Sequence, residues 1–168
     1  EFEGGGVYYA ATDLEARVCG QDAVTVIGGG NSAGQAAVFL ARRGADVTIV
    51  IRGEALTSSM SSYLIDRIDA APTIAVRPHS EVTELHGEAR LEAVTITDTA
   101  TGVSIRQPCI GLFSFIGAVP FTDWLVGFID LDEDGFILTD SDLHDVGFDP
   151  LPFETSRAGV FAAGDVRA

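Results

Sequence analysis

AVTVIGGGNSAGQAAVFLARRGADVTIVIR, from Ala23 to Arg52, is the stretch of the chain that decides its fold. It predicts a strand over Val24 to Ile27, a helix over Asn31 to Arg43 and a second strand over Asp46 to Ile51. The first strand is apolar throughout rather than alternating, which is typical of a parallel strand buried on both faces. Gly44 supplies a stop after the helix. A strand, a glycine-rich turn, a helix and a second strand thus follow one another within about 30 residues.

The turn between the first strand and the helix has the spacing G-x-G-x-x-A. Gly28 allows the tight turn off the strand, Gly30 lets the backbone approach a pyrophosphate, and Ala33 is small enough for the helix to press on the strand. The helix N-terminus would face the phosphates. A glycine turn alone can simply link a strand to a helix, but between two strands we expect a dinucleotide site. Its candidate cofactor-binding residues are Gly28, Gly29, Gly30, Asn31, Ser32 and Ala33.

The residue at the end of the second strand bears on which ligand the turn binds. NAD sites tend to carry an acid there for the ribose 2′-hydroxyl, whereas an arginine can pair with a 2′-phosphate. Arg52 stands at this place, beside Glu54, so we expect NADPH, with NADH as the alternative cofactor. S-Adenosylmethionine is an alternative ligand for such a turn. Methyltransferases, however, usually place an acid where Ile51 and Arg52 stand.

The remainder of the chain predicts an α/β fold. Ser58 and Ser59 are candidate caps of a second helix or, alternatively, donors of hydrogen bonds to the 2′-phosphate. The apolar stripe of that helix is Met60, Leu64 and Ile68. Further strands are predicted, in chain order, over residues 73–76, 81–86, 93–98, 103–107, 110–116, 136–139 and 159–165. The three within residues 81–107 are short, alternating or rich in β-formers, which is typical of an antiparallel meander. We therefore expect a Rossmann-like three-layer NAD(P)-binding domain with a parallel sheet and a small antiparallel β meander.

Composition argues against several kinds of partner and site. The formal net charge is −15, and both nucleic acid and anionic membranes require basic patches, so we expect neither as a partner. The longest nearly apolar run, residues 110–121, is too short to span a bilayer. Cys19 and Cys109 lie far apart with no C-x-x-C spacing, which favours reduced packing residues in a cytoplasmic protein. The three histidines are scattered and form no metal-ligand pattern, so no metal site is expected.

Four motifs fall in an order known from one family of flavoproteins. They are the glycine turn from Gly28 to Ala33, Arg52, the segment FIGAVP from Phe115 to Pro120, and the terminal VFAAGD from Val160 to Asp165. In this order and spacing the chain resembles the thioredoxin reductases. The resemblance implies that residues 8–119 form an NAD(P)H-binding domain. It also implies that residues 1–7 and 120–168 are fragments of a split FAD-binding domain.

The same resemblance assigns roles to four further residues. Gly164 and Asp165 match the flavin-contacting pair of the family, whose aspartate binds the FAD ribityl chain. Gly117 and Ala118 are expected near the nicotinamide, at the carboxyl edge of the sheet, where open α/β sheets bind their ligands. No residue of the chain is expected to be catalytic, because the cofactors carry the chemistry and the protein binds and orients them.

Two positions depart from the family's pattern. The redox C-x-x-C is expected within Tyr9 to Asp13, where Ala10 and Asp13 replace the two cysteines. Alanine cannot attack a disulfide, so dithiol exchange is not available to this chain. The family's His-Arg-Arg with a further downstream arginine reads here as Ile51-Arg52-Gly53 with Thr57, which weakens the expected preference for NADP.

The leading hypothesis is the NAD(P)H-binding part of an FAD-dependent oxidoreductase, which passes hydride from NADPH to FAD and then electrons to an unknown acceptor. The chain opens without Met, and we expect a piece of a longer protein, inactive alone and a homodimer when full-length. Alternatives are a sensor module that binds NAD(P)H without turnover, an enzyme like the ferredoxin–NADP reductases and, more remotely, a methyltransferase. A second G-x-G-x-x-G upstream in the full protein would favour the enzyme over the sensor.

Overall fold

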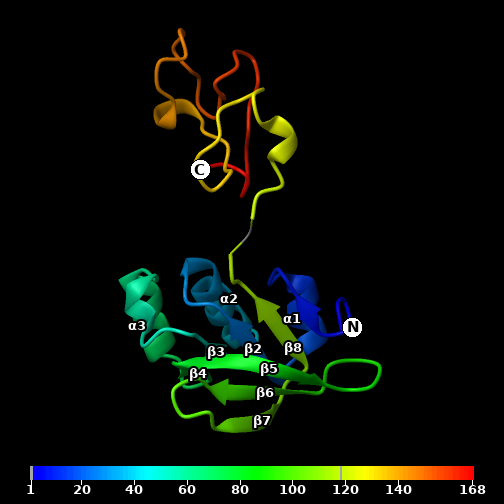
Figure 1. Cartoon of the computed structure of the whole chain (residues 1–168). Helices are drawn as coiled ribbons and strands as arrows, with labels where there is room; N and C mark the ends of the chain where they lie inside the picture. The colour runs from blue at the N-terminus through cyan, green and yellow to red at the C-terminus, as the bar shows by residue number, and fades with distance from the viewer. Residues whose placement is uncertain (1, 118) are drawn as a thin grey trace. The chain divides into compact units, whose positions relative to one another are not determined.

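The computed structural model describes residues 2–117 and 119–168 of the chain. The chain forms two compact units, Glu1–Ile116 and Gly117–Ala168, and the helices and strands labelled in Figure 1 all belong to the first. None of the helices in these described ranges is long and apolar enough to cross a membrane.

The first unit is built from short strands and three α-helices. The strands are β1 (Val7–Tyr8), β2 (Ala23–Ile27), β3 (Asp46–Val50), β4 (Ile74–Arg77), β5 (Ser80–His86), β6 (Ala93–Asp98), β7 (Ser104–Pro108) and β8 (Gly111–Ser114). The helices are α1 (Asp13–Cys19), α2 (Asn31–Arg42) and α3 (Ser62–Asp69). A 3-10 turn, η1 (Leu56–Ser58), precedes α3.

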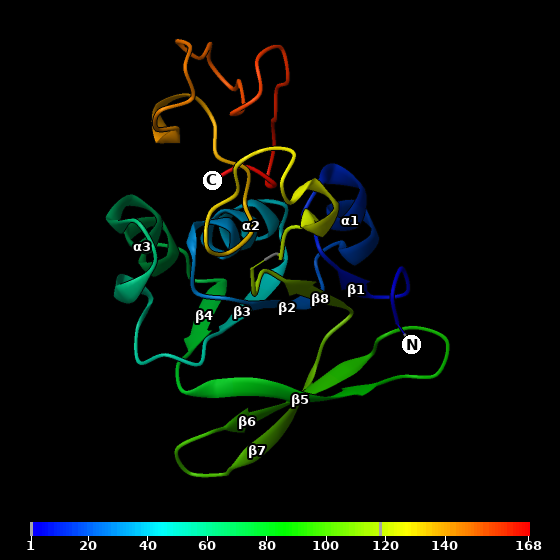
Figure 2. The ribbon, with the colours of Figure 1, turned by 45° about the horizontal axis from the view of Figure 1, so that its top comes forward.

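The strands form two sheets. A five-stranded sheet in the order β1-β8-β2-β3-β4 has only parallel pairs, and β5-β6-β7 form an antiparallel sheet. Figure 2 shows the three helices over one face of the parallel sheet and the antiparallel sheet below the other. One hydrophobic core lies between helices and sheet, and a second, which includes Val50, Val94 and Leu112, lies between the two sheets. The predicted α/β, Rossmann-like fold with an antiparallel meander is confirmed.

Helix α2 packs on the parallel sheet through a face of small residues. Ala33, Ala36, Ala37 and Leu40 share that face, and all four are buried, as their helical spacing predicts. After the helix, Gly44 adopts a φ of +101°, a conformation that favours glycine and ends the helix where the sequence predicts.

The start of the next helix was predicted too early. α3 begins at Ser62, because Leu56–Ser58 form a 3-10 turn instead. The Ser58 hydroxyl donates to the Ala55 carbonyl, and the Ser59 hydroxyl donates to the Gly29 carbonyl, so neither serine caps α3. The predicted apolar stripe Met60, Leu64 and Ile68 is nevertheless buried against the core.

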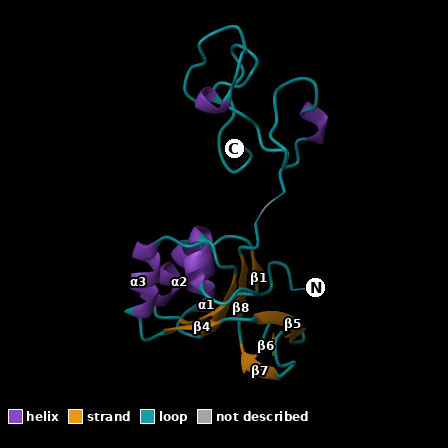
Figure 3. Cartoon of the chain, turned by 60° about the vertical axis from the view of Figure 1, so that its left-hand side comes forward, coloured by secondary structure: helices purple, strands orange, loops and turns teal. Residues whose placement is uncertain are grey.

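The second unit has no continuous strand among residues 117 and 119–168. Figure 3 shows it mainly as loop, with two 3-10 turns, η2 (Asp123–Leu125) and η3 (Asp140–Asp142). The strands predicted over 136–139 and 159–165 are represented only by isolated bridges, such as Leu131 with Ile137 and Glu154 with Phe161. A β-strand needs a neighbour along its length, and each of these segments meets its neighbours only at single residues. A small core holds this unit together; it consists of Leu125, Ile129, Ile137 and Ala162.

The packing of α2 on the sheet predicts a large loss of stability for Leu40→Ala. Leu40 is fully buried, so the truncation should lower the free energy of unfolding by about 3 kcal/mol. Gln35→Ala, at an exposed position of the same helix, should change it by less than about 0.5 kcal/mol. Urea unfolding followed by circular dichroism measures both, and equal midpoints for the two variants would contradict the packing.

Candidate functional site

The glycine turn leaves the carboxyl end of β2 in the middle of the parallel sheet, between β3 and β8. Gly28 has a φ of +132°, and its N–H donates to the Val50 carbonyl at 3.1 Å. A β-carbon at this position would lie 2.4 Å from the carbonyl oxygen of Phe115 and 3.3 Å from the β-carbon of Ala33. The packing of the protein therefore requires glycine at position 28. Ala33 lies close to the turn, as its predicted role in helix–strand packing requires.

Gly30 differs from Gly28 in what surrounds it. Its φ is −86°, which other residues adopt, and a β-carbon there would meet no heavy atom within 4 Å. Gly30 is the N-cap of the twelve-residue helix α2 and has no side chain to accept from the first-turn N–H groups. These N–H groups are free to donate to an anion such as a pyrophosphate, and the positive end of the helix dipole favours its negative charge.

Two side-chain contacts tie the turn to the segment before α3. The Ser59 hydroxyl donates to the Gly29 carbonyl at 2.9 Å, and the Asn31 Oδ1 accepts from the Ser61 N–H at 2.8 Å. Asn31 and Ser32 are exposed. The role of Ser59 was missed from the sequence, because it depends on how α3 packs beside α2 and leaves no pattern along the chain.

Arg52 lies just beyond β3, at the same carboxyl edge of the sheet from which the glycine turn leaves. Its side chain and that of the neighbouring Glu54 are exposed. The first unit thus brings the predicted residues Gly28 to Ala33 and Arg52 to one edge of one sheet.

The remaining predicted residues belong to the second unit. Gly117 and Gly164 have φ values of +96° and +89°, and a β-carbon on either would meet nothing within 4 Å. Asp165 is exposed, in a turn that the Arg167 N–H closes by donating to the Gly164 carbonyl at 3.2 Å. Ala118 lies outside the described residues.

The segment expected to hold a C-x-x-C carries structural contacts instead. Thr12 caps α1 with Glu15 in a reciprocal capping box, and the Asp13 carboxylate forms an ion pair with Arg43. The two cysteines of the chain, Cys19 and Cys109, are buried and unpaired with each other, as predicted.

Neither cysteine is activated as a nucleophile. Burial raises the pKa of Cys19 to about 11, with further contributions from Cys109, Glu15 and Asp22. Burial also raises the pKa of the Cys109 thiol. The thiolate is the nucleophilic form of cysteine, so both side chains remain thiols at neutral pH.

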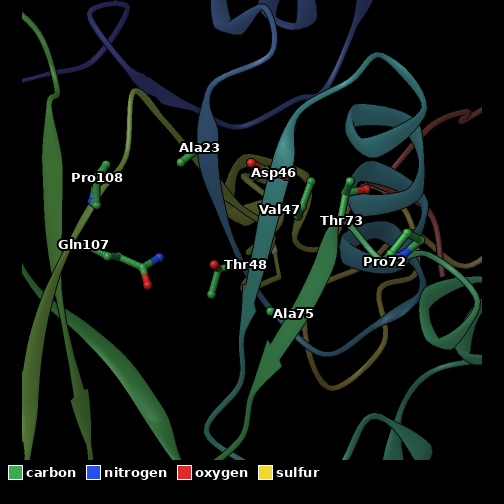
Figure 4. Close-up of a pocket in the computed structure, with 9 residues that line it drawn as sticks. All are labelled: Ala23, Asp46, Val47, Thr48, Pro72, Thr73, Ala75, Gln107 and Pro108. Atoms are coloured by element: carbon green, nitrogen blue, oxygen red, sulfur yellow. The ribbon is translucent and has the colours of Figure 1, made fainter.

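A groove of about 310 Å³ lies at the opposite edge of the parallel sheet from the glycine turn and Arg52. It is found at the amino ends of β2, β3 and β4, beside β7, and Figure 4 shows Thr48 and Gln107 on its two sides. The glycine turn stands at the carboxyl ends of the same strands, so the groove is separate from the candidate site. No cluster of three metal-ligating side chains is found among the described residues.

Comparisons with known proteins agree with this geometry. The model of the family described as pyridine nucleotide-disulphide oxidoreductase matches residues 5–168. The thioredoxin reductase of Streptomyces clavuligerus is 38% identical over 143 residues, which cover 85% of this chain and 41% of that protein. The thioredoxin reductase of Treponema pallidum (strain Nichols) is 34% identical over 168 residues, covering 100% of this chain and 50% of that protein.

Solved structures give the same result. The crystal structure of T. acidophilum thioredoxin reductase has a TM-score of 0.77 at 29% identity and covers 98% of this chain and 50% of its own. Thioredoxin reductase from Streptococcus pyogenes MGAS5005 has a TM-score of 0.75 at 32% identity, with 97% and 49% covered. The chain spans about half the length of the curated relatives it matches. With its parallel sheet, its glycine turn and a family match over almost its whole length, the chain belongs to the pyridine nucleotide-disulphide oxidoreductase family and is thioredoxin reductase-like.

Proposed function

We propose that the chain is the NAD(P)H-binding part of a thioredoxin reductase-like, FAD-dependent oxidoreductase that passes hydride from NADPH to FAD without a redox-active disulfide. The observation that carries this proposal is the open space at Gly30, where the protein's own packing gives no reason for glycine. A ligand whose phosphates approach the backbone at the start of α2 does give one.

The chain's own residues bind and orient the nucleotide. The first-turn N–H groups of α2 would hold the pyrophosphate, and the contacts of Ser59 and Asn31 keep the turn in place. Arg52 would pair with the 2′-phosphate of NADPH, with NADH as the weaker alternative. FAD, bound in the complete protein, supplies the capacity to accept hydride and pass on electrons.

The proposed domains follow the family's split arrangement. Residues 8–119 would form the NAD(P)H-binding domain, with Gly117 and Ala118 near the nicotinamide. Residues 120–168 would belong to the FAD-binding domain, where the exposed Asp165 and the open backbone at Gly164 are available to the flavin. Residues 1–7 would be a further fragment of that FAD-binding domain. Within the first unit, Phe2 packs into the core between the sheets.

The absence of a C-x-x-C from this sequence bears on the acceptor. Ala10 carries no thiol, Asp13 is engaged with Arg43, and the two cysteines are buried. We therefore propose that electrons leave the flavin for an acceptor other than a protein disulfide reduced through this chain. A sensor that binds NAD(P)H without turnover is the second candidate, favoured by the same missing thiols, and flavin reduction by NADPH in the full-length protein would exclude it.

The contrast between the two glycines gives a direct test of the binding site. Gly30→Val should abolish NADPH binding in a calorimetric titration, because the side chain would occupy the approach to the backbone. It should cost the fold only about 1 kcal/mol, as expected of a changed helix N-cap. Gly28→Val should instead destabilise the chain by more than about 2 kcal/mol, because the β-carbon would overlap the Phe115 carbonyl. Unchanged NADPH affinity in a folded Gly30→Val variant would overturn the assignment.

Arg52→Ala should raise the dissociation constant of NADPH about tenfold and leave that of NADH almost unchanged, because only NADPH carries the 2′-phosphate. Calorimetric titration measures both. Arg106→Ala, which removes an exposed arginine of β7, serves as the control for lost charge. Equal losses for both nucleotides would mean that Arg52 does not recognise the 2′-phosphate.

The buried cysteines predict an unreactive chain. At pH 8 the folded chain should react with Ellman's reagent only as fast as it unfolds, since Cys19, with a pKa of about 11, and the buried Cys109 are both protonated and inaccessible. In the chain unfolded by guanidinium, both thiols should react with the reagent immediately. Rapid reaction of the folded chain would show that a thiol is available for exchange.

A further inference from the structure

We propose that Arg77, at the end of β4, is a second residue that determines specificity for the 2′-phosphate, acting beside Arg52. The inference rests on the proposed function, because it needs the dinucleotide to lie on the glycine turn. Arg77 comes from a different strand than Arg52, and the pairing of β3 with β4 brings the two residues to one edge of the sheet.

The register of the parallel sheet brings Arg77 to the corner where β3 ends. Val50, the last residue of β3, pairs with Arg77, the last residue of β4. Arg52 follows Val50 by two residues, and neighbouring strands lie only about 4.8 Å apart. The long side chains of both arginines are exposed at this edge. A phosphate beyond the end of β3 is therefore within the range of both.

Three backbone hydrogen bonds hold the corner in one conformation. The Ile51 N–H donates to the Arg77 carbonyl at 3.0 Å, the His79 N–H donates to the Gly53 carbonyl at 3.0 Å, and the Ser80 N–H donates to the Ile51 carbonyl at 2.9 Å. The bonds at Ile51 and Gly53 flank Arg52, and one of them uses the carbonyl of Arg77. The two guanidinium groups are thus attached to backbone that is already fixed, which lowers the entropic cost of binding.

His79 shows how firmly this corner is constrained. Its φ of +48° is unusual for a residue other than glycine. Its carbonyl accepts from the N–H of Thr99 at 2.6 Å and from the Thr99 hydroxyl at 2.9 Å, which joins the corner to the end of β6. These contacts fix the backbone that follows Arg77.

Charge gives the second reason for assigning a role to Arg77. The chain carries a formal net charge of −15, and Glu54 stands two residues from Arg52. A single arginine beside a carboxylate presents no net positive charge to a phosphate dianion, whereas two arginines do. Within the part of the chain that the structure describes, neither Arg52 nor Arg77 forms an ion pair, so both are available to a ligand.

The test compares calorimetric titrations of the 168-residue chain and its variants with NADPH and with NADH. Arg77→Gln should raise the dissociation constant of NADPH about tenfold and leave that of NADH within about twofold. Arg77→Lys should recover part of the loss, because it keeps the charge but not the two-pronged geometry. Arg106→Gln, on the exposed β7 of the antiparallel sheet, should change neither. Thermal unfolding of each variant checks that the fold is retained.

The outcomes separate this inference from the proposed function. Suppose that the wild-type chain binds NADPH and that Arg77→Gln leaves both affinities unchanged or weakens both equally. That result would overturn the role of Arg77 alone. A wild-type chain that binds neither nucleotide would overturn the proposed function and this inference together. Selective loss of NADPH in Arg77→Gln, with Arg106→Gln unchanged, would support both.

Discussion

The contact between the backbone at Gly28 and the carbonyl of Phe115 is the constraint on which the candidate site depends. A β-carbon at position 28 would lie 2.4 Å from that carbonyl oxygen, so only glycine lets β8 lie against β2 up to the point where the turn begins. The Phe115 N–H also donates to the Ile27 carbonyl at 2.8 Å. Because the strands stay together to this edge, the first turn of α2 opens on the carboxyl side of the sheet, where Arg52 also lies.

Much of the first unit was predictable because its elements are determined by local pattern. The helix from Asn31 and its flanking strands have strong periodicity, a glycine turn and a glycine stop, and they form close to where the sequence predicts. The second helix was placed too early, because the Ser59 hydroxyl has a distant acceptor at Gly29 that no local pattern reveals. The strands predicted over 136–139 and 159–165 did not form. A strand is stabilised by hydrogen bonds to a neighbouring segment along its length, and these segments meet partners only at isolated residues.

The candidate site divides in the same way. The residues from Gly28 to Ala33 and Arg52 lie in one continuous strand–turn–helix–strand unit, so sequence alone predicted their common position. Arg77 could not be found from the sequence, since its relation to Arg52 depends on the register between β3 and β4. The distinction between the two glycines was also invisible in the pattern: one is required by packing, whereas the other is surrounded by open space. That open space is the observation from which we propose that the turn binds a ligand.

The most direct test of the account is an amide NMR titration of the isotope-labelled chain with NADPH. The account predicts that the N–H resonances of Gly29, Gly30 and Ser32 shift as the nucleotide is added, because its pyrophosphate binds to the first turn of α2. Resonances beside the groove at Thr48 and Gln107 should stay in place, and S-adenosylmethionine should shift none of them. Addition of NADPH without any change at the glycine turn would contradict the central claim that this turn binds the dinucleotide.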